Sequence, residues 1–186
     1  MILDKDTAHR QIFRLAYIAR NIAFYRALAK YKGTFAQNFW IYAFNNYFDM
    51  AVLEWCKVFG SRGEPTHWSA VVQDADSFRA SLLAELKLTQ EEWHAYWEQM
   101  KNYRDLAIAH HMQDPRVTQY PILDIALQAT SFYYKFLVSA LGDLPEEPIY
   151  FLPKDLESNY QRLLEHAEQV ATAAYESSRG IEDKVK

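Results

Sequence analysis

Turn-forming residues are scarce in this chain, and that scarcity limits the folds it can adopt. The 186 residues include only 5 Gly and 6 Pro. Sandwiches and barrels join many short strands and need turn residues at close intervals, so a few long elements are expected instead. Half of the residues are hydrophobic, which is enough for a sizeable core, and the length suits one domain.

Apolar residues recur at helical spacing along most of the sequence. The pattern predicts helices over about residues 6–31, 34–59, 75–86, 89–111, 121–141 and 154–178. Thr89 and Glu92 form a capping box at the start of the fourth segment. We therefore predict an all-α fold, an up-and-down antiparallel bundle of about six helices. It would be a single domain over residues 1–186, with a frayed tail at 179–186.

Charge is distributed unevenly along the chain. Residues 1–33 carry seven Lys and Arg against two Asp, whereas residues 143–186 carry five basic and ten acidic residues. As solvated helix faces, the two ends are expected to attract each other weakly. The net charge of −4 argues against a broad nucleic-acid-binding surface, because clustered Lys and Arg provide the affinity for phosphates. If RNA binds, Arg10 and Arg14 are the candidates for supporting phosphate contacts.

Several kinds of site and segment lack a signature in the sequence. The one cysteine, Cys56, excludes an internal disulfide and a cysteine-based zinc site, and its apolar neighbours predict a packed, inert thiol. There is no Gly-rich phosphate loop, His-Glu-x-x-His segment or acidic calcium loop, so we expect neither metal nor cofactor. Without a leader-like N-terminal segment or a run of about 18 apolar residues, we expect a cytoplasmic protein that does not insert into a membrane.

Aromatic residues make up 16% of the chain, and many of them lie at core spacing. Residues with this spacing in the second segment are Trp40, Phe44, Tyr47, Phe48 and Trp55. Such a stripe is typical of a core rather than of a base-stacking platform. His67, which precedes Trp68 in a loop, is expected to be a surface or capping residue, in a loop that can fold over a ligand.

The segment YRDLAIAHH, residues 103–111, contains a set of side chains suited to handling phosphate. Arg104 has a permanent charge and a planar fork of donors for phosphate oxygens. His110 and His111 can exchange a proton near neutral pH, and Asp105 can orient Arg104 or a histidine. The competing interpretation is a surface ion pair between Arg104 and Asp105, with both histidines at the negative end of the helix dipole.

The angular spacing of an α-helix brings part of this set together. At about 100° per residue, Arg104 and His110 lie about 60° to either side of Ala107. His111, seven residues after Arg104, is almost in line with it. Large side chains line the earlier turns and alanines line this one, so the spacing predicts a cleft between the charged groups.

The segment Tyr-Arg-Asp-x-x-x-Ala-His, residues 103–110, resembles the Arg-x4–6-His signature of the HEPN superfamily. These all-helical domains occur in prokaryotic defence and toxin–antitoxin systems. The block LEWCKVFG, residues 53–60, and the following His67-Trp68 loop are similar to the abortive-infection branch of the superfamily. The likeness covers roughly residues 40–112.

The resemblance implies a metal-independent endoribonuclease that works as a homodimer, with one composite site where the Arg/His segments of two chains meet. Arg104 would stabilise charge on the scissile phosphate, His110 would act as general acid or base, and Asp105 would position them. The products would be a 2′,3′-cyclic phosphate and a 5′-hydroxyl. A nucleotidyltransferase-type antitoxin is the usual companion of such toxins.

The sequence departs from the family pattern at several positions. His111 duplicates the histidine, so either His110 or His111 can be the acting residue, and Leu106 and Ala107 stand where relatives often carry polar residues. Two further functions stay open at this point. One is a non-catalytic helical dimerisation or protein-interaction module, and the other is a nucleotide or small-ligand sensor lined by aromatic residues.

Overall fold

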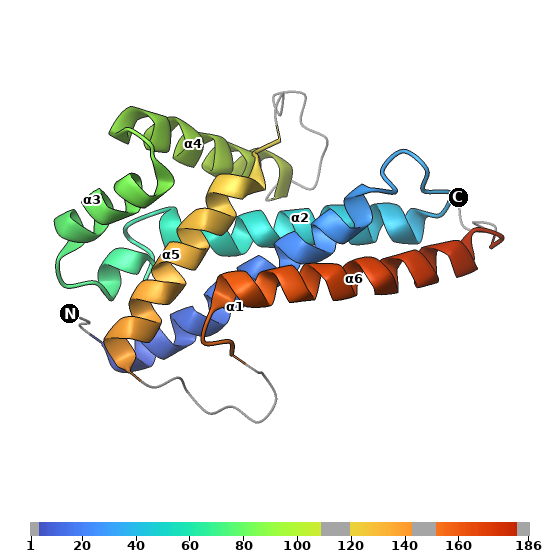
Figure 1. Ribbon diagram of the computed structural model, residues 1–186. Coiled ribbons are helices and arrows are strands. Elements are labelled where there is room, and N and C mark those ends of the chain that lie inside the picture. Colours follow the sequence, from blue (N-terminus) through green and yellow to red (C-terminus); the bar gives the residue numbers. More distant parts are fainter. Residues whose placement is uncertain (1–3, 109–119, 143–151, 182–186) are drawn as a thin grey trace.

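The computed structural model describes residues 4–108, 120–142 and 152–181, and this part of the chain is helical and without strands. Its α-helices, labelled in Figure 1, are α1 (Lys5–Ala29), α2 (Asn38–Phe59), α3 (Ala75–Leu86), α4 (Gln90–Tyr103), α5 (Leu123–Leu141) and α6 (Leu156–Ser178). A short 3-10 helix, Trp68–Ala70, precedes α3, and a π-helical turn, Arg104–Ile108, continues α4. We call the latter the π segment. The predicted all-α helical bundle is confirmed.

The first helix lies at the centre of the bundle, where α1 packs against α2, α5 and α6. Arg26, near the end of α1, meets Asp124 at the start of α5 and Tyr160 near the start of α6. Gln11, near the start of α1, meets Tyr133 in the second half of α5. Helix α5 therefore runs antiparallel to α1. Of the remaining helices, α3 packs on α5 and α4 packs on α2.

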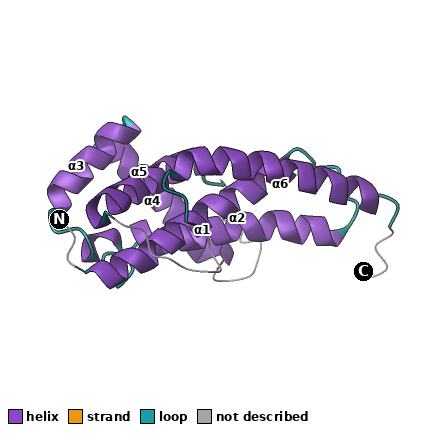
Figure 2. Ribbon diagram, turned by 60° about the horizontal axis from the view of Figure 1, so that its bottom comes forward, coloured by secondary structure: helices purple, strands orange, loops and turns teal. Residues whose placement is uncertain are grey.

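Two regions can be distinguished along the long axis of the molecule. Parts of α1, α2 and α6 continue together beyond α3, α4 and α5, as both ribbon views show (Figures 1 and 2). We call residues 24–47 and 164–178 the arm, and the other described residues the body. The arm has its own small hydrophobic cluster, which Tyr25 and Leu164 connect to the main core of the body.

Local signals at helix ends explain where α3 ends and where α4 begins. The bounds predicted for α3 match the structure. Thr89 and Glu92 form both hydrogen bonds of the predicted capping box, which starts α4. Lys87 ends α3 in the left-handed region with φ of 55°, an uncommon conformation for a residue with a side chain.

The starts of three other helices differ from the prediction. Helix α2 begins at Asn38 instead of residue 34 or 35, because the turn after α1 continues through Gly33, whose φ is +86°. Helix α5 begins at Leu123, so Pro121 precedes the helix rather than lying in its first turn. Helix α6 begins at Leu156, two residues later than predicted, because the Asp155 carboxylate accepts from two backbone amides and caps it.

The fourth helix, α4, differs most from the prediction. The sequence predicts one α-helix to about His111, whereas α4 ends at Tyr103 and the π segment follows to Ile108. The predicted stop at Asp114 and Pro115 lies outside the described residues, as does most of the predicted connector between α5 and α6. None of the helices described has both the length and the apolar composition that a membrane crossing requires.

Candidate functional site

Arg104 and Asp105 form an ion pair at the start of the π segment. Arg104 Nε and Nη2 lie 2.7 and 2.6 Å from Asp105 Oδ1. The Arg104 side chain is 24% exposed and that of Asp105 is 51% exposed, so solvent reaches the pair. The structure therefore brings together two of the residues predicted for the site. The predicted His110 and its alternate His111 lie outside the described residues.

The π segment changes the geometry assumed for this set. A π-helix closes its hydrogen bonds over five residues rather than four, so each residue turns through a smaller angle than in an α-helix. The estimate that placed Arg104 and His110 on either side of Ala107 assumed a regular α-helix, and it does not apply here. Ala107 is half-buried and packs against the main core.

The structure adds a carboxylate that the sequence interpretation missed. Asp49, on α2, accepts a hydrogen bond of 2.7 Å from the hydroxyl of Tyr103, the residue before Arg104. A signal for it is present in the sequence, because Asp49 is the one acidic residue among the first sixteen of α2. An isolated acid in such an apolar helix needs a partner, which an interpretation limited to nearby residues does not identify.

Cys56 lies on the same side of α2 as Asp49, but its thiol is not reactive. Its thiol donates to the carbonyl oxygen of Met100 at 3.7 Å. Burial raises the pKa of Cys56 to about 12, and the charge of Arg104 opposes this shift without cancelling it. A thiol with this pKa is not ionised at neutral pH. The prediction of a packed, inert cysteine is confirmed.

The two arginines predicted to support RNA binding have different surroundings. Arg14 forms an ion pair with Glu54 on α2, a buried residue whose other oxygen lies 2.6 Å from Lys57 Nζ. Its guanidinium therefore balances a buried carboxylate. Arg10 is exposed and donates to Thr7 Oγ1 at 2.7 Å. Of the two, Arg10 is the better placed to meet a phosphate.

Helix α1 from the basic stretch and helix α6 from the acidic stretch pack side by side, as the charge pattern predicts. Lys30, directly after α1, is 3.7 Å from Glu168 on α6, and both side chains are well exposed. Exposed pairs of this kind contribute about 0–1 kcal/mol. The attraction between the two ends is therefore a minor contribution to the packing of α6.

His67 caps the 3-10 helix and is buried rather than exposed. Its Nδ1 accepts from the backbone amide of Ser69 at 3.2 Å and lies 2.7 Å from the hydroxyl of that residue. Burial, with a smaller effect of Arg62, lowers the pKa of His67 to about 4. The next ring, Trp68, stacks on Phe78 with centroids 4.6 Å apart. The capping role is confirmed, and this loop packs into the core.

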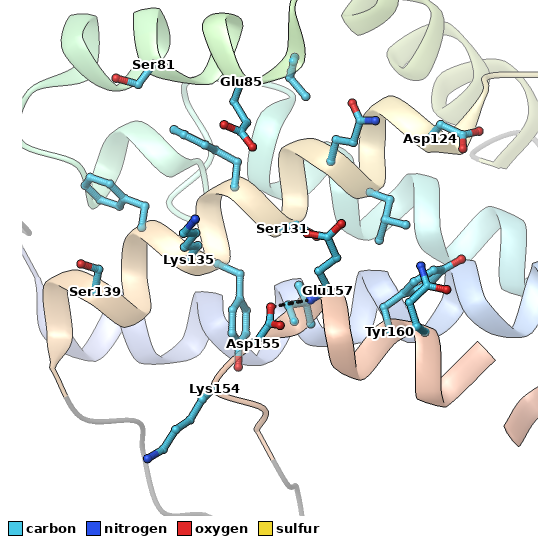
Figure 3. Close-up of a pocket in the computed structure, with 18 of the residues that line it drawn as sticks. Ser81, Glu85, Asp124, Ser131, Lys135, Ser139, Lys154, Asp155, Glu157 and Tyr160 are labelled. Carbon is cyan, nitrogen blue, oxygen red and sulfur yellow. Dashed lines mark hydrogen bonds between the residues drawn. The ribbon is translucent and has the colours of Figure 1, made fainter. Parts of the chain in front are cut away.

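A groove runs between α3, α5 and α6 on another part of the body (Figure 3). None of the residues predicted for the site lines it. Its charged side chains are of both signs: Glu85, Lys87, Asp124, Lys135, Lys154, Asp155 and Glu157. Asp155 already caps α6, and this hydrogen bonding, mainly with Ser158, lowers its pKa. The mixed charge indicates no preference for an anionic or a cationic ligand.

No metal centre is found in the described part of the chain, where no group of three or more His, Cys, Asp and Glu side chains is placed to hold an ion. Models of known protein families, curated protein sequences and solved structures were compared with the chain, and none of them matches. The functional interpretation therefore depends on the side chains themselves.

Proposed function

We propose that the chain is a HEPN-like, metal-independent endoribonuclease of a phage-defence or toxin–antitoxin type system. The observation that carries the proposal is the position of Arg104. Its guanidinium is partly exposed, it starts the π segment, and it directly follows the end of α4 that packs on α2. Helical turns of this wider type often occur at functional sites.

The pairing of Arg104 with Asp105 is compatible with a role in binding phosphate. Ion pairs exposed to solvent contribute only about 0–1 kcal/mol, so a substrate can displace the carboxylate at little cost. A phosphate offers oxygens that match the guanidinium fork in two parallel hydrogen bonds. In the absence of RNA, Asp105 would keep the guanidinium in one orientation.

In the proposed reaction, the 2′-hydroxyl of the RNA attacks the adjacent phosphorus and the 5′-oxygen leaves. Arg104 stabilises the negative charge that develops on the phosphate oxygens. His110, or His111 in its place, transfers the proton from the attacking hydroxyl or to the leaving oxygen. The products are a 2′,3′-cyclic phosphate and a 5′-hydroxyl, and no metal ion takes part.

An uncovered face of α2 supports the proposed homodimer. Tyr42 is 67% exposed, and it lies on the same line of α2 as Asp49 because the two are seven residues apart. Phe39, one turn earlier, is 68% exposed. The helix carries no charged side chain between Asn38 and Phe48. An uncharged, aromatic face is typical of the centre of a protein–protein contact, and an antitoxin of the nucleotidyltransferase type is a second partner that it would suit.

The second candidate is a non-catalytic dimerisation or interaction module, which the Arg104–Asp105 pair favours. In that case the pair is permanent, and the uncovered face of α2 alone accounts for the function. The two candidates share the dimer and differ in the role of Arg104.

Cleavage of single-stranded RNA by wild type, Arg104→Ala and Arg162→Ala tests the proposal. Loss of one charge-stabilising group is expected to lower cleavage by about 10²–10³-fold. Arg162 is exposed on α6, so its substitution should leave cleavage within twofold. Both substitutions should change the free energy of unfolding by less than about 0.5 kcal/mol.

Sedimentation of the same proteins tests the dimer that both candidates require, and the cleavage assay separates the two. A dimer that cleaves RNA only with Arg104 present supports the ribonuclease. A wild-type dimer that leaves varied RNAs intact contradicts it and supports the interaction module. A monomer contradicts both candidates.

A further inference from the structure

Tyr103, the last residue of α4, is held on three sides. Its hydroxyl donates to Asp49 on α2 at 2.7 Å. Its ring meets Phe48 edge-on with centroids 5.1 Å apart, and meets Tyr120 at 5.4 Å. Only 7% of the residue is exposed. The ring therefore has little freedom to turn, and the backbone that carries it is fixed with it.

A second contact joins the same two helices close by. The Cys56 thiol donates to the Met100 carbonyl oxygen, one turn before Tyr103. Asp49 and Cys56 are seven residues apart and so share one face of α2. Helix α2 thus holds the last turn of α4 at two points, and the π segment starts directly after the second of them, at Tyr103.

We infer that Asp49 and Tyr103 are positioning residues for Arg104, because their hydrogen bond fixes the end of α4 from which the guanidinium extends. The inference depends on the proposed RNA cleavage. The Arg104 amide still donates to the Met100 and Lys101 carbonyl oxygens, and the wider π-helical pattern follows. The direction of Arg104 is therefore set by the last turn of α4, which the Tyr103 side chain anchors to α2. An error of about 1 Å in the position of a group at a reaction centre can lower the rate about 10²-fold.

The Tyr103 phenol does not titrate near neutral pH. Burial and the Asp49 carboxylate raise the pKa of Tyr103 well above its ordinary value, so the phenol keeps its proton and remains the donor. Removing the hydroxyl should therefore lower the rate equally at each pH. The shape of the pH–rate profile should stay that of wild type, since the proton-transferring groups are unchanged.

Tyr103→Phe tests the inference, because it removes the hydroxyl and keeps the ring. The matched control is Tyr96→Phe on the same face of α4, where the hydroxyl donates to the Ile122 carbonyl oxygen at 2.9 Å. With a labelled single-stranded RNA, Tyr103→Phe should lower kcat about tenfold and leave KM within twofold. Tyr96→Phe should leave both within twofold. Asp49→Asn, which keeps an oxygen acceptor, should lose less than Tyr103→Phe.

Amide hydrogen exchange provides a readout that does not require cleavage. Exchange of residues 104–108 should be several-fold faster in Tyr103→Phe than in Tyr96→Phe or wild type. Equal exchange and equal kcat in the two variants would overturn the inference, as would an altered pH profile in Tyr103→Phe. Wild-type protein that cleaves no RNA would contradict the proposed function, and the exchange result would then decide alone whether the anchor holds this segment.

Discussion

In the body, Trp55 is completely buried against the rings of Phe59, Trp93 and Tyr96, whereas three of the five buried residues in the hydrophobic cluster of the arm are alanines. The buried residues of the arm cluster are Ala27, Leu28, Phe44, Ala167 and Ala171, and aromatic rings surround them at partial exposure. Alanines let the three helices approach closely but bury little area for each residue. The same helices therefore gain more from hydrophobic burial in the body than in the arm.

Hydrogen bonds at the tip of the arm offset this difference. The Tyr175 hydroxyl donates to the Thr34 carbonyl oxygen at 2.5 Å, and Trp40 Nε1 donates to Ser178 Oγ at 2.8 Å. Gln37 Nε2 donates to the carbonyl oxygens of Ser178 and Ile181, both at 2.8 Å. Packed volume thus stabilises the body, while directional contacts between the end of α6 and the turn after α1 stabilise the arm.

Replacing one tryptophan in each region gives the largest expected difference. Trp55→Ala removes a fully buried ring and should lower the free energy of unfolding by about 3–5 kcal/mol. Trp40→Ala removes a half-buried ring with one hydrogen bond and should cost about 1–2 kcal/mol. Urea unfolding followed by far-UV circular dichroism measures both. Equal losses would show that the two regions do not differ in this way.

Tyr175→Ala should open the arm without opening the body. Tyr175 contacts Tyr31, Phe35 and Trp40, so its loss should cost about 2–3 kcal/mol, mostly as local opening. Amide hydrogen exchange should accelerate in residues 31–47 and 164–178. Residues 51–59 should keep the wild-type rates. Uniform acceleration along the chain would mean that the arm and the body unfold as one unit.

Protonation of His67 in acid should lower the free energy of unfolding of the body, and this is the smallest of the three expected effects. The folded pKa of about 4 lies below the ordinary 6.5, so the unfolded chain binds the proton first. The contribution of His67 to the free energy of unfolding is therefore fully present above about pH 6.5 and is lost as the pH drops towards 4. Between pH 7 and pH 5 the loss should be about 1–2 kcal/mol by urea unfolding.

His67→Asn checks the source of that loss, because asparagine keeps an acceptor for the Ser69 amide but does not titrate. This variant should show a shallower dependence of stability on pH than wild type. His166→Asn, at an exposed position of α6, should behave like wild type. If lowering the pH accelerated amide hydrogen exchange in the arm at a higher pH than in the body, a group other than His67 would be responsible for the loss.

Much of the fold could be predicted because its signals are local. The bounds of α3 and the Thr89–Glu92 capping box depend on residues within one or two turns of each other. The buried stripe of α2 follows from helical periodicity, which requires no knowledge of the partner helix. The later start of α2 was missed because the turn at Gly33 extends further than the apolar pattern indicates.

The site was harder to predict because its partners are distant in sequence. Arg14 and Glu54 are 40 residues apart, and Tyr103 and Asp49 are 54 apart. Tertiary packing determines both pairs, so an interpretation limited to neighbouring residues names Arg104, Asp105 and the two histidines but not Asp49. The π segment has no apparent local signal in its sequence, Arg-Asp-Leu-Ala-Ile.

The central position of α1 also has a consequence for how the chain folds. Gln11 contacts Tyr133 across 122 residues, and Tyr31 contacts Thr172 across 141. Contacts over such separations form slowly, because long loops must close before they gain any stabilising contact. During synthesis, α1 and α2 can pair early, but the face of α1 that meets α5 and α6 remains exposed until those two helices have been made. Folding should therefore finish only after α6 has been made, and α1 is the segment most exposed to premature association.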